Sequence, residues 1–210
     1  MEWQDTQGDI AVCQECIGRW KGLVIQPQQV GEIPDPPPIV KVLFVGMAPT
    51  NREGKNKGNH FYSAARDALR NGLFRLLGIP LDGLRLEEAI SVFHRRGYFF
   101  VHAGKIRPVG QDAPPRDALM YCANRHLRIE INILNPVAIC FLGVTNLALV
   151  TTALFDRQID EIPVRVSLDR WTGWVALAFQ PVRGGEKRTA LVLEKLLSLV
   201  NGQDFIDKTI

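Results

Sequence analysis

The pattern of apolar and polar positions predicts a protein built from strands that alternate with helices. Four runs are apolar on both faces, as buried parallel strands are. These runs are VKVLFV (40–45), GYFFVHAG (97–104), VAICFLG (137–143) and WVALAF (174–179). A shorter segment, PVRVSL (163–168), has the pattern of a strand at the edge of a sheet.

The segments between these runs have helical periodicity. Leucine and isoleucine recur there at the spacing that puts them on one face of a helix. The predicted helices span residues 64–77, 116–134, 144–154 and 187–200. This alternation predicts an α/β fold, a three-layer α/β/α sandwich around a four-stranded, mainly parallel sheet with right-handed crossovers.

The chain divides into an arm, one large domain and a short tail. Residues 1–38 form a polar N-terminal arm that carries a C-x-x-C motif and ends in the connector GEIPDPPPIV, whose consecutive prolines exclude a helix. Residues 39–203 make up the predicted α/β domain, and residues 204–210 are the C-terminal tail. No internal repeat competes with this division.

Composition excludes few classes of function. The chain has 210 residues, of which 46% are hydrophobic and 22% charged, as expected for one folded domain with an arm. No run of about 18 apolar residues is present, and the N-terminus lacks a basic head and an apolar signal core, so we expect a soluble cytoplasmic protein without a membrane partner. A net charge of +3 permits a polyanionic partner but does not require one.

Three predicted loops leave the carboxyl ends of the strands, where such sheets bind ligands. They are rich in Gly and in basic residues, which favours a ligand that carries phosphate, although surface loops are often simply polar. The basic residues are Arg52, Lys55, Lys57, Lys105, Arg107, Arg183, Lys187 and Arg188. The first loop is not a P-loop, because Gly46 lies too far before Gly54 and Lys55 is followed by Asn56.

The four cysteines suggest metal binding or core packing before disulfides. Cys13 and Cys16 form the C-x-x-C motif, and Cys122 lies on a predicted helix. Cys140 lies within the apolar run VAICFLG and is most simply a thiol of the core.

Taken in order, these motifs resemble the uracil-DNA glycosylase superfamily, and within it the iron–sulfur branches. The first is VLFVGMAPTNREGKNKGNHF (42–61), a strand that ends in Gly46, followed by Pro49 and a Gly-rich loop that reaches Phe61. VHAGKIRPVG (101–110) is similar to the family's strand and Lys-x-Arg-Pro-Pro segment. The segment 122–150 is similar to its Cys-bearing helix, Leu-x-Pro turn and Leu-Gly strand.

The resemblance implies a uracil-DNA glycosylase-like fold and a DNA base-excision glycosylase, which hydrolyses the N-glycosidic bond of uracil or a related damaged base. In that family the loop after the first strand holds a flipped base, which implies roles in base or DNA binding for Gly46, Met47, Pro49 and Asn51. Phe61 would stack on the base; alternatively it is a core residue that packs at the start of the next helix.

Several positions depart from the family's pattern. Met47 and Ala48 stand where members commonly have an acid or amide, so the candidate catalytic acids lie downstream at Glu53 and Asp67, although each could equally be a solvated charge. Gln180 replaces the His that stabilises negative charge on the leaving base, which predicts weak or absent catalysis because an amide carries no positive charge.

The remaining candidates read the base or contact DNA. His102 stands where the family often has an Asn that reads the base, and it could donate to a base carbonyl or be structural. The basic residues after the fourth strand, Arg183, Lys187 and Arg188, would bind the DNA backbone.

Three of the family's four cluster ligands have counterparts here, which are Cys13, Cys16 and Cys122, while Ile106 stands at the fourth Cys position. A 4Fe–4S cluster with an incomplete ligand set, or zinc with His126 or His102, are both open. Two functions therefore remain, a glycosylase and an impaired relative that binds nucleic acid or a nucleotide without cleaving it. DNA is the expected partner, and we expect a monomer.

Overall fold

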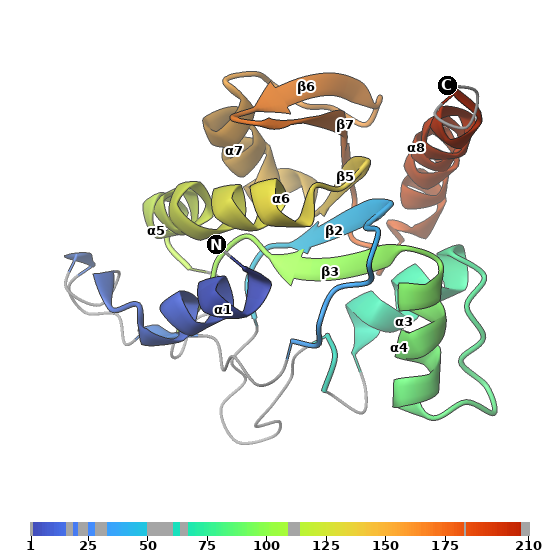
Figure 1. The fold of residues 1–210 in the computed structure, drawn as a ribbon, viewed down its shortest axis with the longest axis horizontal. Coiled ribbons are helices and arrows are strands. Elements are labelled where there is room, and N and C mark those ends of the chain that lie inside the picture. The colour runs from blue at the N-terminus through green and yellow to red at the C-terminus, as the bar shows by residue number, and fades with distance from the viewer. Residues whose placement is uncertain are drawn as a thin grey trace.

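The structure is a computed structural model that describes residues 2–15, 19–20, 25–27, 33–49, 61–63, 67–108, 114–182 and 184–206. Its centre is a five-stranded sheet in the order β3-β2-β5-β7-β6 (Figure 1). The strands are β2 (Val42–Gly46), β3 (Tyr98–His102), β5 (Ala138–Leu142), β6 (Val164–Leu168) and β7 (Trp171–Ala178). The first four in this spatial order run parallel, and β6 pairs antiparallel with β7.

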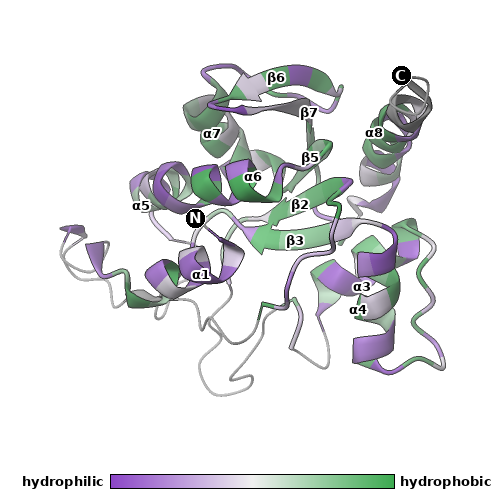
Figure 2. Cartoon of the chain, viewed as in Figure 1, coloured by the Kyte–Doolittle hydropathy of each residue, from purple (hydrophilic) through white to green (hydrophobic). Residues whose placement is uncertain are grey.

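Helices cover both faces of this sheet, which confirms the three-layer α/β/α prediction (Figure 1). On one side lie α3 (Ala68–Leu76), α4 (Leu86–Arg95) and α8 (Glu186–Ile206). On the other lie α1 (Trp3–Val12), the helical segment 116–134 and α7 (Val144–Phe155). Figure 2 shows that the central strands are mostly hydrophobic, because both of their faces are covered.

The strand count differs from the predicted four, because β6 belongs to the same sheet. A two-residue turn at Asp169 and Arg170 joins β6 to β7, so the two strands pair as a hairpin. Asp169 adopts a positive φ of 53°, and its carboxylate accepts hydrogen bonds from Arg128 and Asn132. A separate antiparallel pair, β1 (Ile25–Pro27) with β4 (Ile106–Pro108), was not predicted.

The predicted helix at 116–134 is continuous but not regular. It consists of α5 (Arg116–Cys122), a π-helical turn η2 (Ala123–Leu127) and α6 (Arg128–Leu134). Such π turns occur mostly as single insertions in α-helices and often lie near functional sites. The helix ends at Asn135, which has a positive φ of 43°.

The N-terminal helix packs onto the domain. Trp3 and Ile10 are buried, and the Trp3 ring lies edge-on to Phe99 at a centroid distance of 5.4 Å. Gln7 donates a buried hydrogen bond to Glu130 on α6. Among the described helices, none combines the length and apolarity that crossing a membrane requires.

Candidate functional site

A pocket of about 330 Å³ opens at the carboxyl edge of the sheet. Met47, directly after β2, forms one wall, and the start of α7, residues 143–146, forms another. The third wall follows β7 and consists of Phe179, Gln180, Val182 and Gly185. The pocket therefore lies where parallel α/β sheets bind ligands.

The turn after β7 is tightly fixed. The carbonyl of Gln180 accepts a hydrogen bond from the Val182 N–H at 2.7 Å, and the Gly185 N–H donates to Val182. A Cβ on Gly185 would lie 2.2 Å from the Gln180 carbonyl oxygen, so only glycine fits there. On the other side of the turn, a Cβ on Gly72 of α3 would lie 1.9 Å from the Pro181 carbonyl oxygen. The side chain of Gln180 thus extends from a rigid backbone.

The start of α7 is shaped by Gly143. Its φ of 139° is a conformation that favours glycine, and its N–H donates to the carbonyl of Ala178 at 2.8 Å. A Cβ on Gly143 would lie 3.7 Å from Nε2 of Gln180, so the Gln180 amide lies over this glycine. One turn on, Nδ2 of Asn146 donates to Sδ of Met47 at 3.0 Å, which joins two walls of the pocket.

The pocket is polar without being charged. Its polar side chains in the described part of the chain are Thr145, Asn146 and Gln180, and none of the described lining residues titrates. A hydroxyl and two amides can each donate and accept hydrogen bonds. This lining suits an uncharged ring with both donors and acceptors on its edge.

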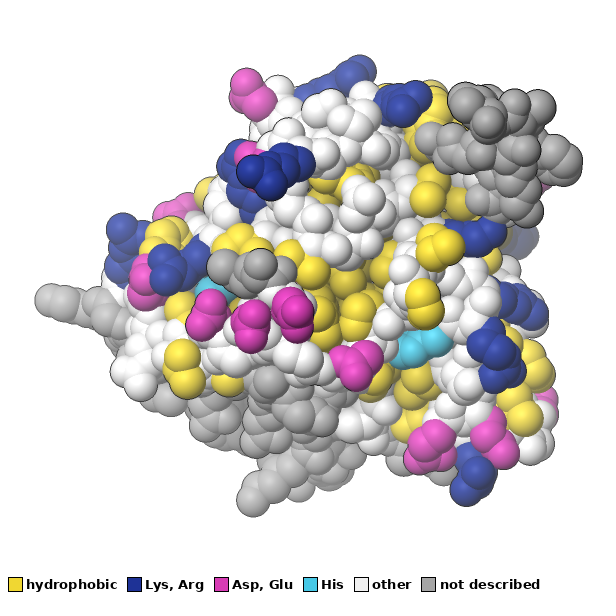
Figure 3. All heavy atoms as spheres, viewed as in Figure 1, with side chains coloured by type: hydrophobic (Ala, Val, Ile, Leu, Met, Phe, Trp, Pro, Cys, Tyr) yellow, Lys and Arg dark blue, Asp and Glu magenta, His cyan; other side chains and the backbone are white. Residues whose placement is uncertain are grey.

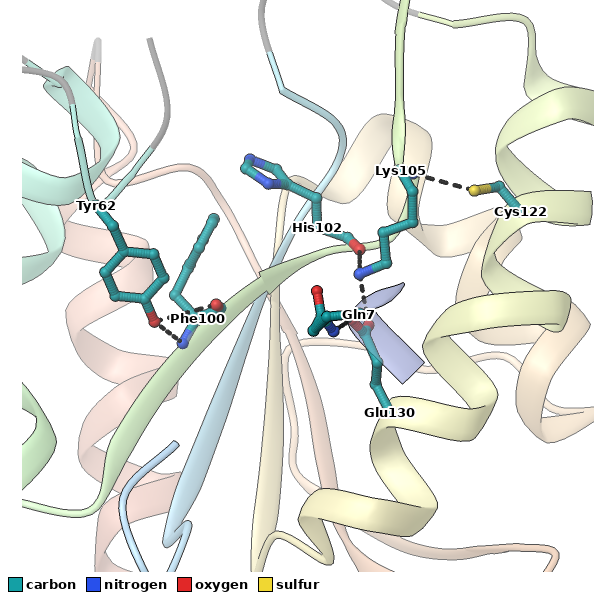
Figure 4. Close-up of polar contacts among 7 residues, drawn as sticks. All are labelled: Gln7, Tyr62, Phe100, His102, Lys105, Cys122 and Glu130. Carbon is teal, nitrogen blue, oxygen red and sulfur yellow. Dashed lines mark hydrogen bonds and ion pairs between the residues drawn. The ribbon is translucent and has the colours of Figure 1, made fainter. Parts of the chain in front are cut away.

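A buried ion pair supports the end of β3, which lies beside β2 on the side away from the pocket (Figure 4). Nζ of Lys105 lies 2.5 Å from Glu130, whose side chain is fully buried, and donates to the carbonyl of His102 at 2.6 Å. The other oxygen of Glu130 accepts from Gln7 at 3.0 Å. The prediction that Lys105 contributes positive charge to the ligand edge is wrong, because Glu130 neutralises it inside the protein.

His102 is buried and pairs in register with Gly46. A Cβ on Gly46 would lie 2.7 Å from the Phe100 ring and 3.2 Å from the His102 ring, so Gly46 allows these two rings to approach the backbone. Pro49 is buried after Met47. Roles of Gly46, Pro49 and His102 in base reading stay predictions.

Phe61 lies in the core at 2% exposure. Its ring stacks on Phe100 at 4.0 Å with an interplanar angle of 8°, and its carbonyl accepts a hydrogen bond from Nη1 of Arg70 at 2.9 Å. The neighbouring Tyr62 hydroxyl bonds both the N–H and the carbonyl of Phe100, which anchors this segment to β3. Phe61 is not among the described residues that line the pocket, and its stacking role stays a prediction.

The other predicted residues are placed as follows. Asp67 caps α3, where its carboxylate accepts the Arg70 N–H at 2.6 Å. Lys187 is exposed at the start of α8. Asn51, Glu53 and Arg183 lie outside the described residues.

The side chain of Arg188 lies between the pocket wall and the protein surface. Its guanidinium lies over the Phe179 ring, 3.8 Å from the ring centroid, and pairs with the carboxylate of Glu161. The side chain is 57% exposed. On the face shown in Figure 3, Lys and Arg side chains are interspersed with Asp and Glu, so that face carries no continuous basic surface among the coloured residues.

The positions of the cysteines bear on the predicted metal centre. Cys122 is buried and its Sγ accepts the Lys105 N–H at 3.0 Å, while Cys13 is partly exposed on the N-terminal arm. Ile106 follows Lys105 directly and supplies no donor atom, and Cys16 lies outside the described residues. The described positions therefore do not supply the four thiolates of a cluster, and they contain no group of three metal-ligating side chains.

Burial in the core explains one cysteine, Cys140, and one histidine, His126. Cys140 is fully buried in β5, which confirms the prediction of a core thiol, and burial raises its pKa to about 12. Burial, followed by the charges of Lys105 and Arg125, lowers the pKa of His126 to about 4. His126 is therefore neutral at physiological pH.

Sequence reasoning missed seven of the nine described lining residues, among them Asn146 and Phe179. Asn146 lies three residues after Gly143, near the start of the predicted helix that follows the third parallel strand, so the rule that ligands bind at the carboxyl ends of strands could have found it. Phe179 is the last letter of the apolar run WVALAF, where it looked like a core residue. Only the structure shows that the strand ends one residue earlier, at Ala178.

A family model described as the Uracil DNA glycosylase superfamily matches residues 34–194. The match includes every strand of the five-stranded sheet and the whole described lining of the pocket. No match was found among curated proteins.

Proposed function

We propose that this chain, which belongs to the uracil DNA glycosylase superfamily, hydrolyses the N-glycosidic bond of uracil or a related damaged base in DNA. The observation that supports this proposal is that Met47 and Gln180, from two family motifs far apart in the sequence, line one pocket. The pocket lies within the matched region, and its uncharged polar lining suits a nucleobase.

The N-glycosidic bond becomes accessible only when the nucleotide leaves the base stack of the DNA. Flipping a base out of a duplex costs roughly a few kcal/mol, which contacts in the pocket have to offset. Lys187 and Arg188 at the start of α8 are exposed beside the pocket wall and supply positive charge for the DNA backbone. Binding that depends on such contacts weakens as salt rises, because condensed counterions are released on binding.

Among the described lining residues, the groups available for chemistry are neutral. As the bond breaks, negative charge moves onto the base, and the Gln180 amide can donate a hydrogen bond to a base oxygen. The rigid turn that carries Gln180 orients this donor before the reaction. The amides of Gln180 and Asn146 can also orient a water molecule, but they cannot take its proton. We therefore expect slow excision.

The second candidate is a relative that binds a base or nucleotide in nucleic acid without cleaving it. The observation that favours it is that the described lining contains no titratable side chain that could act as acid or base. Binding needs shape, stacking and hydrogen bonds, all of which a neutral pocket can supply.

The deciding experiment is a gel assay on single-stranded and duplex oligonucleotides that contain one uracil, with alkaline cleavage of abasic sites. A thymine oligonucleotide of the same sequence is the control. Slow, uracil-dependent cleavage that Gln180→His accelerates supports the glycosylase. Uracil-dependent binding without cleavage by either protein supports the second candidate, and neither binding nor cleavage refutes both.

An iron–sulfur cluster is a separate proposal, which concerns Cys13, Cys16 and Cys122. Protein purified without oxygen should then show broad blue-visible absorption and bound iron, and Cys122→Ser should remove both. A colourless preparation without iron or zinc would end this proposal. No step of the proposed reaction depends on the cluster.

A further inference from the structure

We propose that the bound base stacks on Phe179, and that Arg188 is the positioning residue that holds this ring. The inference rests on the proposed function, because it concerns the same pocket. It assigns the stacking surface to Phe179 in place of Phe61.

Phe179 is the aromatic side chain among the described residues that line the pocket. It follows the last residue of β7, is partly exposed and directly precedes Gln180. The Arg188 guanidinium lies 3.8 Å from its centroid. Because the guanidinium occupies one face, the opposite face is the one that a planar ligand can cover.

Phe61 is a poorer surface in this conformation. Its ring is 2% exposed, and Phe100 stacks on one face at 4.0 Å. Three further aromatic rings, from Tyr62, Phe74 and Phe93, pack against it within 5.8 Å between centroids. A base could use the Phe61 ring only after displacing part of this cluster, which would cost packing in the core.

Two consecutive residues of α8 fix Phe179. The Thr189 hydroxyl, which is fully buried, donates to the Phe179 carbonyl at 2.7 Å, while Arg188 lies over the ring. Glu161, in the segment before β6, holds the guanidinium from the other side. One turn of helix thus contacts both the backbone and the ring of Phe179, so the ring is held in place before any ligand binds.

The ligand class follows from what surrounds this ring. Gln180 and Asn146 place two amides in the same pocket, and each can donate one hydrogen bond and accept another. A flat, uncharged heterocycle with adjacent donors and acceptors satisfies both, and a pyrimidine with an imide edge, such as uracil, is such a ring. Stacking on Phe179 supplies affinity, and the two amides select a base by the hydrogen-bond donors and acceptors on its edge.

The test measures the preference for uracil in a substrate that resists cleavage. Single-stranded oligonucleotides carry either 2′-fluoro-2′-deoxyuridine, whose fluorine opposes the oxocarbenium-like transition state, or an abasic tetrahydrofuran analogue at one position. Fluorescence anisotropy gives Kd for each, and the ratio of the two Kd values removes contributions from phosphate contacts, which both oligonucleotides share.

We expect Phe179→Leu to weaken binding of the uracil oligonucleotide by about 5- to 100-fold and to remove the preference, as loss of a stacking ring does. Phe179→Tyr keeps a ring and should retain the preference. Arg188→Met should reduce the preference about two- to fivefold, and Arg188→Lys, which keeps a cation over the ring, should restore part of it. Phe155→Leu, at the far end of α7, controls for loss of a buried ring and should leave the ratio unchanged.

The outcomes separate this inference from the proposed function. A preference that Phe179→Leu removes supports the inference, and it does so even if the parent protein cleaves no uracil, in which case only the glycosylase proposal fails. A preference that survives Phe179→Leu but is lost in Phe61→Leu overturns the inference and leaves the function standing. A parent protein without any preference and without cleavage refutes both.

Discussion

Replacing Lys105 by Met should destabilise the protein severely, because it leaves the Glu130 carboxylate buried without a counter-charge. The side chains of Lys105 and Glu130 are 3% and 0% exposed, and Nζ lies 2.5 Å from the carboxylate. Removing one partner of such a pair typically costs about 3–5 kcal/mol. The His102 carbonyl also loses its Lys105 donor, at about 1 kcal/mol more. A loss of this size is a large fraction of the stability of an ordinary domain, about 5–15 kcal/mol.

Urea unfolding followed by fluorescence of the four tryptophans measures this loss. The double variant Lys105→Met with Glu130→Leu should recover most of the stability, because an apolar pair of similar volume replaces the ion pair. Arg85→Gln is the exposed control, since the Arg85–Glu88 pair has 78% and 45% exposed side chains and should contribute at most about 1 kcal/mol. If Lys105→Met costs no more than Arg85→Gln, the argument from burial is refuted.

Three further predictions concern the pocket and the helix beside it. Gly72→Ala should lower the free energy of unfolding in urea by about 1–3 kcal/mol and weaken uracil binding, because its Cβ would lie 1.9 Å from the Pro181 carbonyl oxygen. The control is Gly8→Ala, which has open space around it and should be neutral or stabilising. His126 has a pKa of about 4 in the folded protein, against an ordinary 6.5. As pH falls, the unfolded state therefore binds the proton first, and the free energy of unfolding should drop by up to about 3 kcal/mol between pH 6.5 and pH 4. His126→Gln should flatten that drop in unfolding experiments across the same range, and an unchanged slope would contradict the assignment. Gln180→His should raise the single-turnover rate of uracil excision on the order of tenfold, and an equal or slower rate would show that Gln180 does not face the leaving base.

The fold was predictable because its strands are buried on both faces. Each of the four apolar runs became a parallel or antiparallel strand of one sheet, and the segment 163–168 formed the edge strand. Two helices, α1 and α4, lie outside the predicted ranges. The helix α1 escaped prediction because it has few apolar residues and packs partly through a polar one. Gln7 is buried, and its amide is satisfied by Glu130, which lies 123 positions away in the sequence.

The site was predictable in outline and less so in detail. Met47 and Gln180, which the family resemblance singled out after two strands, line one cavity at the carboxyl edge, and their roles stay predictions. Lys105 was misread because a lysine in a loop is normally solvated, and its partner Glu130 lies on a distant helix. Phe179 was missed because an apolar residue at the end of a strand can face either the core or the ligand, and period-two alternation gives no answer where a strand stops.

Binding and cleavage make different demands on this pocket. If a base stacks on Phe179 and bonds the Asn146 amide, these contacts act equally before and during bond breaking, so they would contribute affinity without lowering the barrier. Only a group that responds to the negative charge growing on the base lowers the barrier, and in the described lining that group is the neutral amide of Gln180. We therefore expect the described lining, which is uncharged, to favour binding of a base over its excision. We expect added positive charge at Gln180, on a turn held in place by Gly72 and Gly185, to raise the rate of excision.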